Sequence, residues 1–231
     1  TQEDANFQPV IKKNIVNGYD AVRFEESNRR LRKTNFTNFP TTAISGFYVN
    51  KTENANEGGD GVLSYASSSA LNNDFLLFNS NNLSMYVTNQ ARGSGLNVST
   101  ANWNVVGYRW QTSGGANISL NGTDRNINFP SGRVITPGGS LALAGEQDSE
   151  DDGAGGNDGD YVASQAHQGD FAEVIMYDKY INEAERIIVS NYLSAKYNIT
   201  LNSNNFYNED DPGAGNFDYD VAGIGQASDG S

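Results

Sequence analysis

Short runs in which apolar and polar residues alternate make up most of the chain as far as about residue 178. Each run predicts a β-strand, because successive side chains of a strand point to opposite faces of its sheet. Turn-forming residues, mainly Gly, Asn, Ser and Pro, separate the runs at regular intervals, as in a β-sandwich or barrel. The Asn-Gly step in "NGTD" (121–124) predicts a tight hairpin turn. The predicted strands cover residues 19–26, 42–50, 61–67, 73–80, 83–89, 102–111, 116–122, 140–146 and 170–178.

One segment near the C-terminus, "INEAERIIVSNYLSAKYNI", has the period of an amphipathic helix instead. Asn182 is placed to cap its first turn, and Glu185, three residues later, completes a capping box. We therefore expect a helix over residues 182–199 that packs against the edge of the sandwich. The apolar residues at helical spacing are Ile187, Ile188, Leu193 and Tyr197.

These elements predict a single sandwich domain over residues 1–200, with the helix included. Residues 201–231 are rich in Asn, Gly and Asp, which predicts a loop-rich C-terminal extension or the start of a following module. One further strand is possible at "YDVAGIG" (219–225).

Composition narrows the possible functions. The chain of 231 residues carries a formal net charge of −13. Nucleic-acid binding needs patches of Lys and Arg, so this charge argues against it. The short basic run "RRLRK" (29–33) is interpreted as a solvated edge. There is no cysteine, which excludes disulfides and thiolate metal sites. No apolar stretch is long enough to insert directly into a membrane.

Seven carboxylates gather in a glycine-rich stretch that begins as the predicted strand 140–146 ends. Three interpretations are open: a cation site, a solvated acidic surface, or a catalytic carboxylate set in "EQDSE" (146–150). The seven are Glu146, Asp148, Glu150, Asp151, Asp152, Asp158 and Asp160.

Three stretches occur in an order that resembles the pentraxin and laminin-G-like branch of the concanavalin A-like lectin/glucanase superfamily. They are "LSYASSSALNNDFLLF" (63–78), "NWNVVGYRW" (102–110) with "ISLNG", and "GEQDS" followed by "SQ" and "GDFAEV". The resemblance implies an all-β fold: an antiparallel β-sandwich (jelly roll, concanavalin A-like) with one C-terminal amphipathic helix. The helix and "DYDVAGIG" resemble modules of large secreted bacterial surface proteins.

The resemblance also implies a calcium site. Ca²⁺ takes six to eight oxygen ligands, and an extended backbone would point Glu146 and Asp148 the same way, with the carbonyl of Gln147 turned toward the same ion. An oxygen-only set suits Ca²⁺ better than zinc. Carried over from the family, Gln165 and Asn73 join the set, together with Asn72 or Asp74. Phe78 and Tyr161 are the predicted apolar walls of the ligand site.

The chain departs from the pentraxin pattern at two places. Pentraxins have Asp-Asn where this chain has Asn72-Asn73, and Val162 replaces an acidic ligand of a second calcium ion. One ion is therefore expected rather than two, unless other acids of the loop substitute.

The catalytic interpretation is disfavoured because Gln147 and Ser149, between the acids, are polar and are not expected to face a core. We thus expect a non-enzymatic, calcium-dependent module that binds a ligand, most simply a carbohydrate, in a secreted or cell-surface adhesin-like protein of a bacterium. Its partners would be a glycan or another extracellular ligand and the neighbouring modules of a larger chain. A structural spacer remains an alternative, and a laminarinase-type glycoside hydrolase is a weaker one.

Three other side chains carry expectations of their own. His167, the only histidine, is expected at the surface. Trp103 and Trp110 are an odd number of residues apart in one predicted strand and should face opposite sides. One of the two is expected in the core, and the other is a candidate platform for a sugar.

Overall fold

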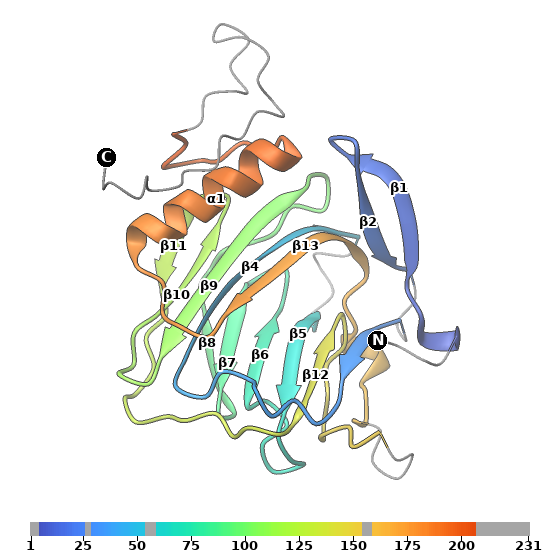
Figure 1. Cartoon of the computed structure of the whole chain (residues 1–231), viewed down its shortest axis with the longest axis vertical. Helices are drawn as coiled ribbons and strands as arrows, with labels where there is room; N and C mark the ends of the chain where they lie inside the picture. Colours follow the sequence, from blue (N-terminus) through green and yellow to red (C-terminus); the bar gives the residue numbers. More distant parts are fainter. Residues whose placement is uncertain (1–4, 26–28, 54–58, 154–158, 207–231) are drawn as a thin grey trace, which may run out of the picture.

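Two antiparallel sheets pack face to face in the computed structural model, which describes residues 5–25, 29–53, 59–153 and 159–206 (Figure 1). One sheet has the strand order β1-β2-β13-β4-β9-β10-β11 and the other β3-β12-β5-β6-β7-β8. The predicted all-β sandwich with one C-terminal helix is therefore confirmed. The elements are η1 Ala5–Phe7, β1 Val10–Val16, β2 Tyr19–Phe24, β3 Leu31–Lys33, β4 Ala43–Thr52, β5 Gly61–Ala66, β6 Phe75–Phe78, β7 Ser84–Val87, β8 Gln90–Gly93, β9 Asn104–Gln111, β10 Ala116–Leu120, β11 Thr123–Asn126, β12 Ser140–Leu143, η2 Ala163–Gln165, β13 Gly169–Tyr177 and α1 Glu183–Tyr197.

Every strand predicted from the sequence corresponds to an interior strand of one of the two sheets. The four described strands that the pattern missed, β1, β3, β8 and β11, lie at the sheet edges. Edge strands are half-solvated, so their residues need not alternate between apolar and polar. In β8, for example, no residue is buried. The hairpin turn between β10 and β11 is confirmed, with Asn121 and Gly122 both at positive φ (47° and 81°).

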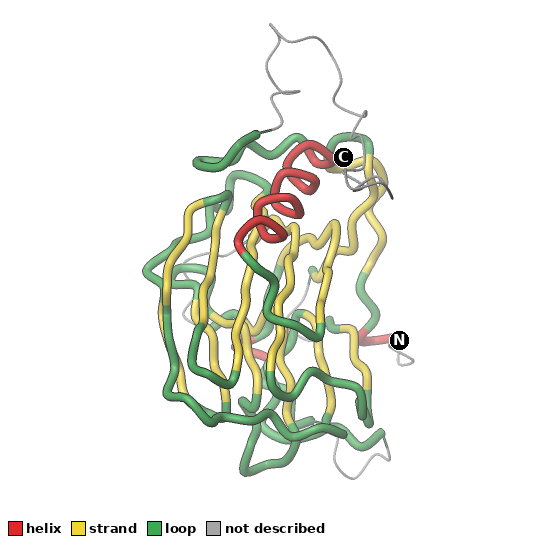
Figure 2. Tube along the Cα trace, turned by 60° about the vertical axis from the view of Figure 1, so that its left-hand side comes forward, coloured by secondary structure: helices red, strands yellow, loops and turns green. Residues whose placement is uncertain are grey.

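The central strands of the seven-stranded sheet are buried on both faces. In β4, Ile44 and Tyr48 face the sandwich core, whereas Phe47 and Val49 face a second core on the outer side. This second core includes Leu193 of α1, so the helix covers the outer face of the sheet. Figure 2 shows the helix crossing outside the strands near one end of the molecule.

The capping box of α1 is confirmed. The side chain of Asn182 accepts from the Glu185 amide at 2.9 Å, and the Glu185 carboxylate accepts from the Asn182 amide at 2.8 Å. Asn198 ends the helix in the left-handed conformation. Ile188, predicted on the apolar face, is instead 41 % exposed, whereas Val189 and Leu193 contact the second core.

The chain continues past the helix without leaving the sandwich. Ile199 and Leu201 are buried, and the Asn202 amide donates to the carbonyl of Asn121 at 2.7 Å. Residues 199–202 thus contact the sandwich, and the predicted domain boundary at residue 200 stays a prediction. The possible strand at 219–225 lies outside the described residues. Within the part of the chain that the structure describes, no helix has the length and apolarity needed to span a membrane.

Gly46 lets two adjacent strands approach closely. It pairs with Tyr108 of β9, and a Cβ atom at Gly46 would collide with the Tyr108 hydroxyl and with the carbonyl of Ile175. We expect Gly46→Ala to lower the free energy of unfolding by about 1–3 kcal/mol, the usual effect of overpacking a core. Gly115→Ala is the control, because its nearest neighbour is the flexible end of Gln111. Equal denaturation midpoints for the two variants would contradict this account.

Candidate functional site

The acidic segment that follows β12 is fixed to the six-stranded sheet by a buried glutamine. The side chain of Gln147 is fully buried. Its oxygen accepts from the hydroxyl of Ser140 at 2.6 Å, and its amide donates to the hydroxyl and carbonyl of Ser64 and to the carbonyl of Ser140. If Gln147 contributes to a metal site, it does so through its main-chain carbonyl, as the sequence predicted, because its side chain is already fully bonded.

The basic run 29–33 is not a solvated edge, and this expectation was wrong. Arg32 forms an ion pair with the buried carboxylate of Asp151. The guanidinium of Arg30 lies over the ring of Tyr161 at 3.7 Å and over that of Phe7 at 4.2 Å. Strand β3 and its flanks thus anchor the acidic segment. The large number of acidic residues in this segment could have predicted that basic residues pair with it. The spacing of the residues in the sequence did not show which basic residues these are.

Glu146 is a deeply buried acid of the segment. Its side chain is 3 % exposed, and burial, with a further contribution from the nearby charge of Asp148, raises its pKa to about 7. Its Oε2 atom is buried without a hydrogen-bond donor in the described structure. Neither acid has a Lys or Arg partner among the described residues. A buried carboxylate without compensation is costly, so this is a position where a cation would stabilise the fold.

The loop before β6 approaches the exposed carboxylate of Asp148. The side-chain amide of Asn72 donates to Asp148 Oδ1 at 3.2 Å, and the amide of Asn73 donates to Asn72 Oδ1 at 3.3 Å. The side-chain oxygen of Asn73 is buried, and it accepts no hydrogen bond in the described structure. Asn72, Asn73 and Asp148 are therefore brought together as predicted, although their role as ligands remains a prediction.

Asp74 does not join this group. Its carboxylate is fully buried, and its Oδ2 atom accepts from the hydroxyl of Ser67 at 2.6 Å and from the amide of Thr136 at 2.9 Å. The Oδ1 atom has no hydrogen-bond partner in the described structure, but no hydrogen bond there joins Asp74 to Glu146 or Asp148. Of the two alternatives considered beside Asn73, the geometry favours Asn72, and we leave Asp74 out of the candidate ligand set.

Gln165 and Phe78 both border the glycine that precedes β5. A Cβ at Gly59 would lie 3.0 Å from Gln165 Cγ and 3.6 Å from the Phe78 ring. Two residues on, Gly61 lies so close to Glu146 that a Cβ would be 2.7 Å from the Glu146 Cβ. The "GDG" segment (59–61) therefore brings Glu146, Gln165 and Phe78 to one place. The sequence analysis did not identify this role of the two glycines, although paired glycines ahead of a strand are a recognisable sign of close approach.

Tyr161 is poorly placed as a wall for a ligand. Arg30 covers its ring, and the surrounding burial raises its pKa. Its hydroxyl lies 3.4 Å from the carboxylate of Asp151, so it belongs to the anchor of the segment. Phe78 is half-buried and packs edge-on against Tyr86, which keeps it as the candidate wall.

The donor set is limited to oxygens. In the described residues no three Asp, Glu, His or Cys side chains form a metal-binding cluster. The candidate site instead combines two carboxylates with the amide oxygens of Asn73 and Gln165. Such oxygen ligands suit Ca²⁺. Among the other acids, Asp151 is paired with Arg32, Asp160 accepts from Ser149 at 3.2 Å, and Asp158 lies outside the described residues.

The sequence argument against a glycosidase assumed that Gln147 and Ser149 would not be buried, and this assumption was wrong. Gln147 and Ser149 are both buried, since hydrogen bonds compensate their polarity. The segment is nevertheless not a regular strand: Gln147 forms a single isolated bridge to Tyr161, and bends follow at 148 and 149. A strand face that aligns all three acids of "EQDSE" is thus not present in this segment.

His167 is fully buried, so its expected surface position was wrong. Its ring packs edge-on against Phe171 with centroids 5.0 Å apart, and burial lowers its pKa to about 4. Trp110 is fully buried and Trp103 half-buried in the second core, which confirms that the two indoles face opposite sides.

Comparison with known proteins places the chain in a family. The model of the Pentaxin family matches residues 31–211. A search of curated proteins gave no match. Among solved structures, the chain resembles a native heptameric SAP-like pentraxin from Limulus polyphemus, with a TM-score of 0.59 and 18 % identity over 78 % of this chain and 84 % of that one.

Two other structures share the fold at lower identity. One is the binding domain of botulinum neurotoxin DC in complex with SialylT (TM-score 0.55, 11 % identity), where the match covers 80 % of this chain but 45 % of that one. The other is domain 4 of AbnA, an extracellular arabinanase from Geobacillus stearothermophilus, in complex with arabinotriose (TM-score 0.54, 10 % identity, 77 % of this chain and 79 % of that one). Because the family model covers well over half of the chain and the sandwich matches a solved pentraxin, the protein belongs to the Pentaxin family.

Proposed function

We propose that the protein binds an extracellular ligand, most simply a glycan, through a calcium ion. The ion would be held by Glu146, Asp148 and Gln165, together with Asn73 and Asn72. The observation that carries this proposal is the buried Glu146 carboxylate, which has an unbonded oxygen and no basic partner in the described structure. The main-chain carbonyl of Gln147 would complete the protein ligands. The family has a non-enzymatic binding fold, and two structural neighbours were solved with saccharides bound.

The bound ion would supply open coordination positions for ligand hydroxyl or anionic oxygens. Phe78 would give the ligand an apolar surface beside Gln165. We further propose that the protein acts outside a bacterial cell or on its surface, beside further modules of a larger chain.

A spacer whose calcium serves only for rigidity is less well supported. The acidic segment is already held by the side chain of Gln147 and by the ion pair between Arg32 and Asp151. Stiffening this segment does not require a metal, so an ion at Glu146 and Asp148 is better explained by a ligand.

Calcium should raise the melting temperature of the protein. With Ca²⁺ at 100-fold excess over a dissociation constant of ~10⁻⁴ M, mass action adds about 2.7 kcal/mol, or roughly 5–10 °C for a chain of this size. Paired thermal melts in calcium and in chelator measure the shift. The double variant Glu146→Gln, Asp148→Asn should abolish it, whereas Asp178→Asn, an exposed acid elsewhere, should not. Coincident wild-type curves would refute the calcium site.

Ligand binding itself requires a second measurement, because a spacer could also bind calcium. On a glycan array, signals should vanish with chelator and return when Ca²⁺ is restored. Gln165→Ala and Asn73→Ala should each lose them. A protein that calcium stabilises but that binds no glycan or peptide would support the spacer instead.

A further inference from the structure

A groove of about 580 Å³ lies under the C-terminal end of α1, far from the acidic segment. Figure 1 places α1 and the gold segments 144–153 and 159–165 at opposite ends of the sandwich. Four separate parts of the chain line the groove: the end of β1 with its turn (15–17), residues 101–103, Asn121, and residues 197–200 with Asn202. Its volume is typical of a site for a small molecule or a short oligomer.

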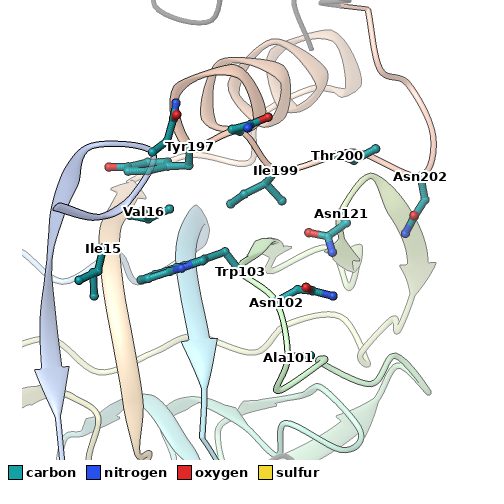
Figure 3. Close-up of a pocket in the computed structure, with 12 residues that line it drawn as sticks. Ile15, Val16, Ala101, Asn102, Trp103, Asn121, Tyr197, Ile199, Thr200 and Asn202 are labelled. Carbon is teal, nitrogen blue, oxygen red and sulfur yellow. The ribbon is translucent and has the colours of Figure 1, made fainter. Parts of the chain in front are cut away.

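One end of the groove is aromatic and aliphatic. Figure 3 shows Trp103 on one side of the hollow and Tyr197 on the other, with Val16 and Ile199 between them. Trp103 is half-buried, and no hydrogen bond holds its indole N–H in the described structure. An indole with a partly open surface and a free N–H offers both an apolar face and a donor.

The other end of the groove is rich in neutral polar groups. Asn102, Asn198 and Thr200 are exposed there, and their side chains make no hydrogen bond within the described residues. Asn202 also lines the groove, and Figure 3 shows it near Asn121. Side-chain amides both donate and accept, so they can bond hydroxyl groups in either sense.

No side chain that lines the groove carries a charge at neutral pH. The one titratable group is the Tyr197 hydroxyl, which donates to the Glu173 carboxylate at 2.8 Å. Burial, and secondly this hydrogen bond, raise its pKa. The groove therefore has no group that would pair with an anionic or cationic ligand, whereas its apolar and amide surfaces lie next to each other.

From this arrangement we propose that the groove is a second binding site, for a short neutral oligosaccharide, and that it works without calcium. The C–H face of a sugar ring packs on Trp103, and the hydroxyl groups bond the amides of Asn102 and Asn198. The proposal is independent of the calcium site, since none of the residues assigned to that site lines the groove.

The test uses the intact protein in chelator, which silences the calcium site. An array of neutral oligosaccharides of glucose, galactose, mannose, xylose and arabinose is probed first, and each hit is then titrated. Acrylamide quenching provides the second readout, because Trp110 is fully buried and only Trp103 is accessible. Bound saccharide should protect Trp103 from the quencher.

We expect Trp103→Ala to weaken binding roughly tenfold, as the loss of a stacking contact implies. Since Trp103 also contacts the second core, Asn102→Ala provides an exposed variant, with an expected loss of roughly threefold to tenfold. Asn81→Ala, an exposed asparagine elsewhere, is the matched control and should bind as the wild type does.

Three outcomes would overturn the proposal. They are the absence of any neutral hit in chelator, hits that survive both groove variants, and a Trp103 that is as protected from acrylamide as Trp110 in the free protein. The last result would mean that another part of the chain fills the groove. Hits seen only with calcium would support the acidic site alone.

Discussion

Replacing Gln147 by methionine should lower the free energy of unfolding by roughly 2–4 kcal/mol. The two side chains have similar shapes, so the change removes hydrogen bonds and leaves little cavity. Gln147 is fully buried and bonds both Ser64 and Ser140. A buried polar group that loses its partner costs about 1–3 kcal/mol, and several groups are affected here.

Urea denaturation in chelator measures this difference without any contribution from metal. Gln168→Met, the same change at a half-buried glutamine whose side chain makes no hydrogen bond in the described structure, should stay within about 0.5 kcal/mol of the wild type. If the two methionine variants unfold at the same urea concentration, Gln147 does not hold the acidic segment in place.

Lowering the pH from 6.5 to 4 should destabilise the wild type by about 3 kcal/mol more than it destabilises His167→Phe. In the folded protein, burial lowers the pKa of His167 to about 4, whereas the unfolded value is near 6.5. Between these values the unfolded chain binds a proton that the folded chain rejects. Stability is therefore lost as the pH falls through this window, by about 1.4 kcal/mol per unit of pKa difference.

Phenylalanine is a suitable replacement because His167 already packs edge-on against Phe171 and makes no hydrogen bond in the described structure. Any strain from the larger ring shifts the stability of the variant at all pH values alike. Glu146 titrates in the opposite sense, because its raised pKa favours the folded state as the pH falls below 7. Both proteins contain Glu146, so its effect cancels in their difference. Parallel pH profiles would show that His167 is not buried as a neutral ring.

The candidate site was partly visible in the sequence. "GEQDS" and "SQ" led to Glu146, Asp148 and Gln165, and the structure brings Asn72 to the Asp148 carboxylate and Asn73 to Asn72. What the pattern could not supply was the direction of each side chain. Asp74 bonds inward to Ser67, and the ring of Tyr161 is covered by Arg30. Neighbours in sequence can thus differ in role because the backbone turns between them.

The sequence by itself determined the interior of the fold. A strand with neighbours on both sides buries apolar residues at regular intervals, so the sequence predicted β4 and β9. The first backbone amides of a helix need hydrogen-bond acceptors, so the sequence also predicted the capped start of α1. Only the tertiary structure determined where the strands at the sheet edges lie and which individual polar side chains are buried. His167, Gln147 and Arg32 are polar residues whose surroundings come from distant segments. Whether such a group faces water or a partner depends on what folds against it, and no local pattern contains that information.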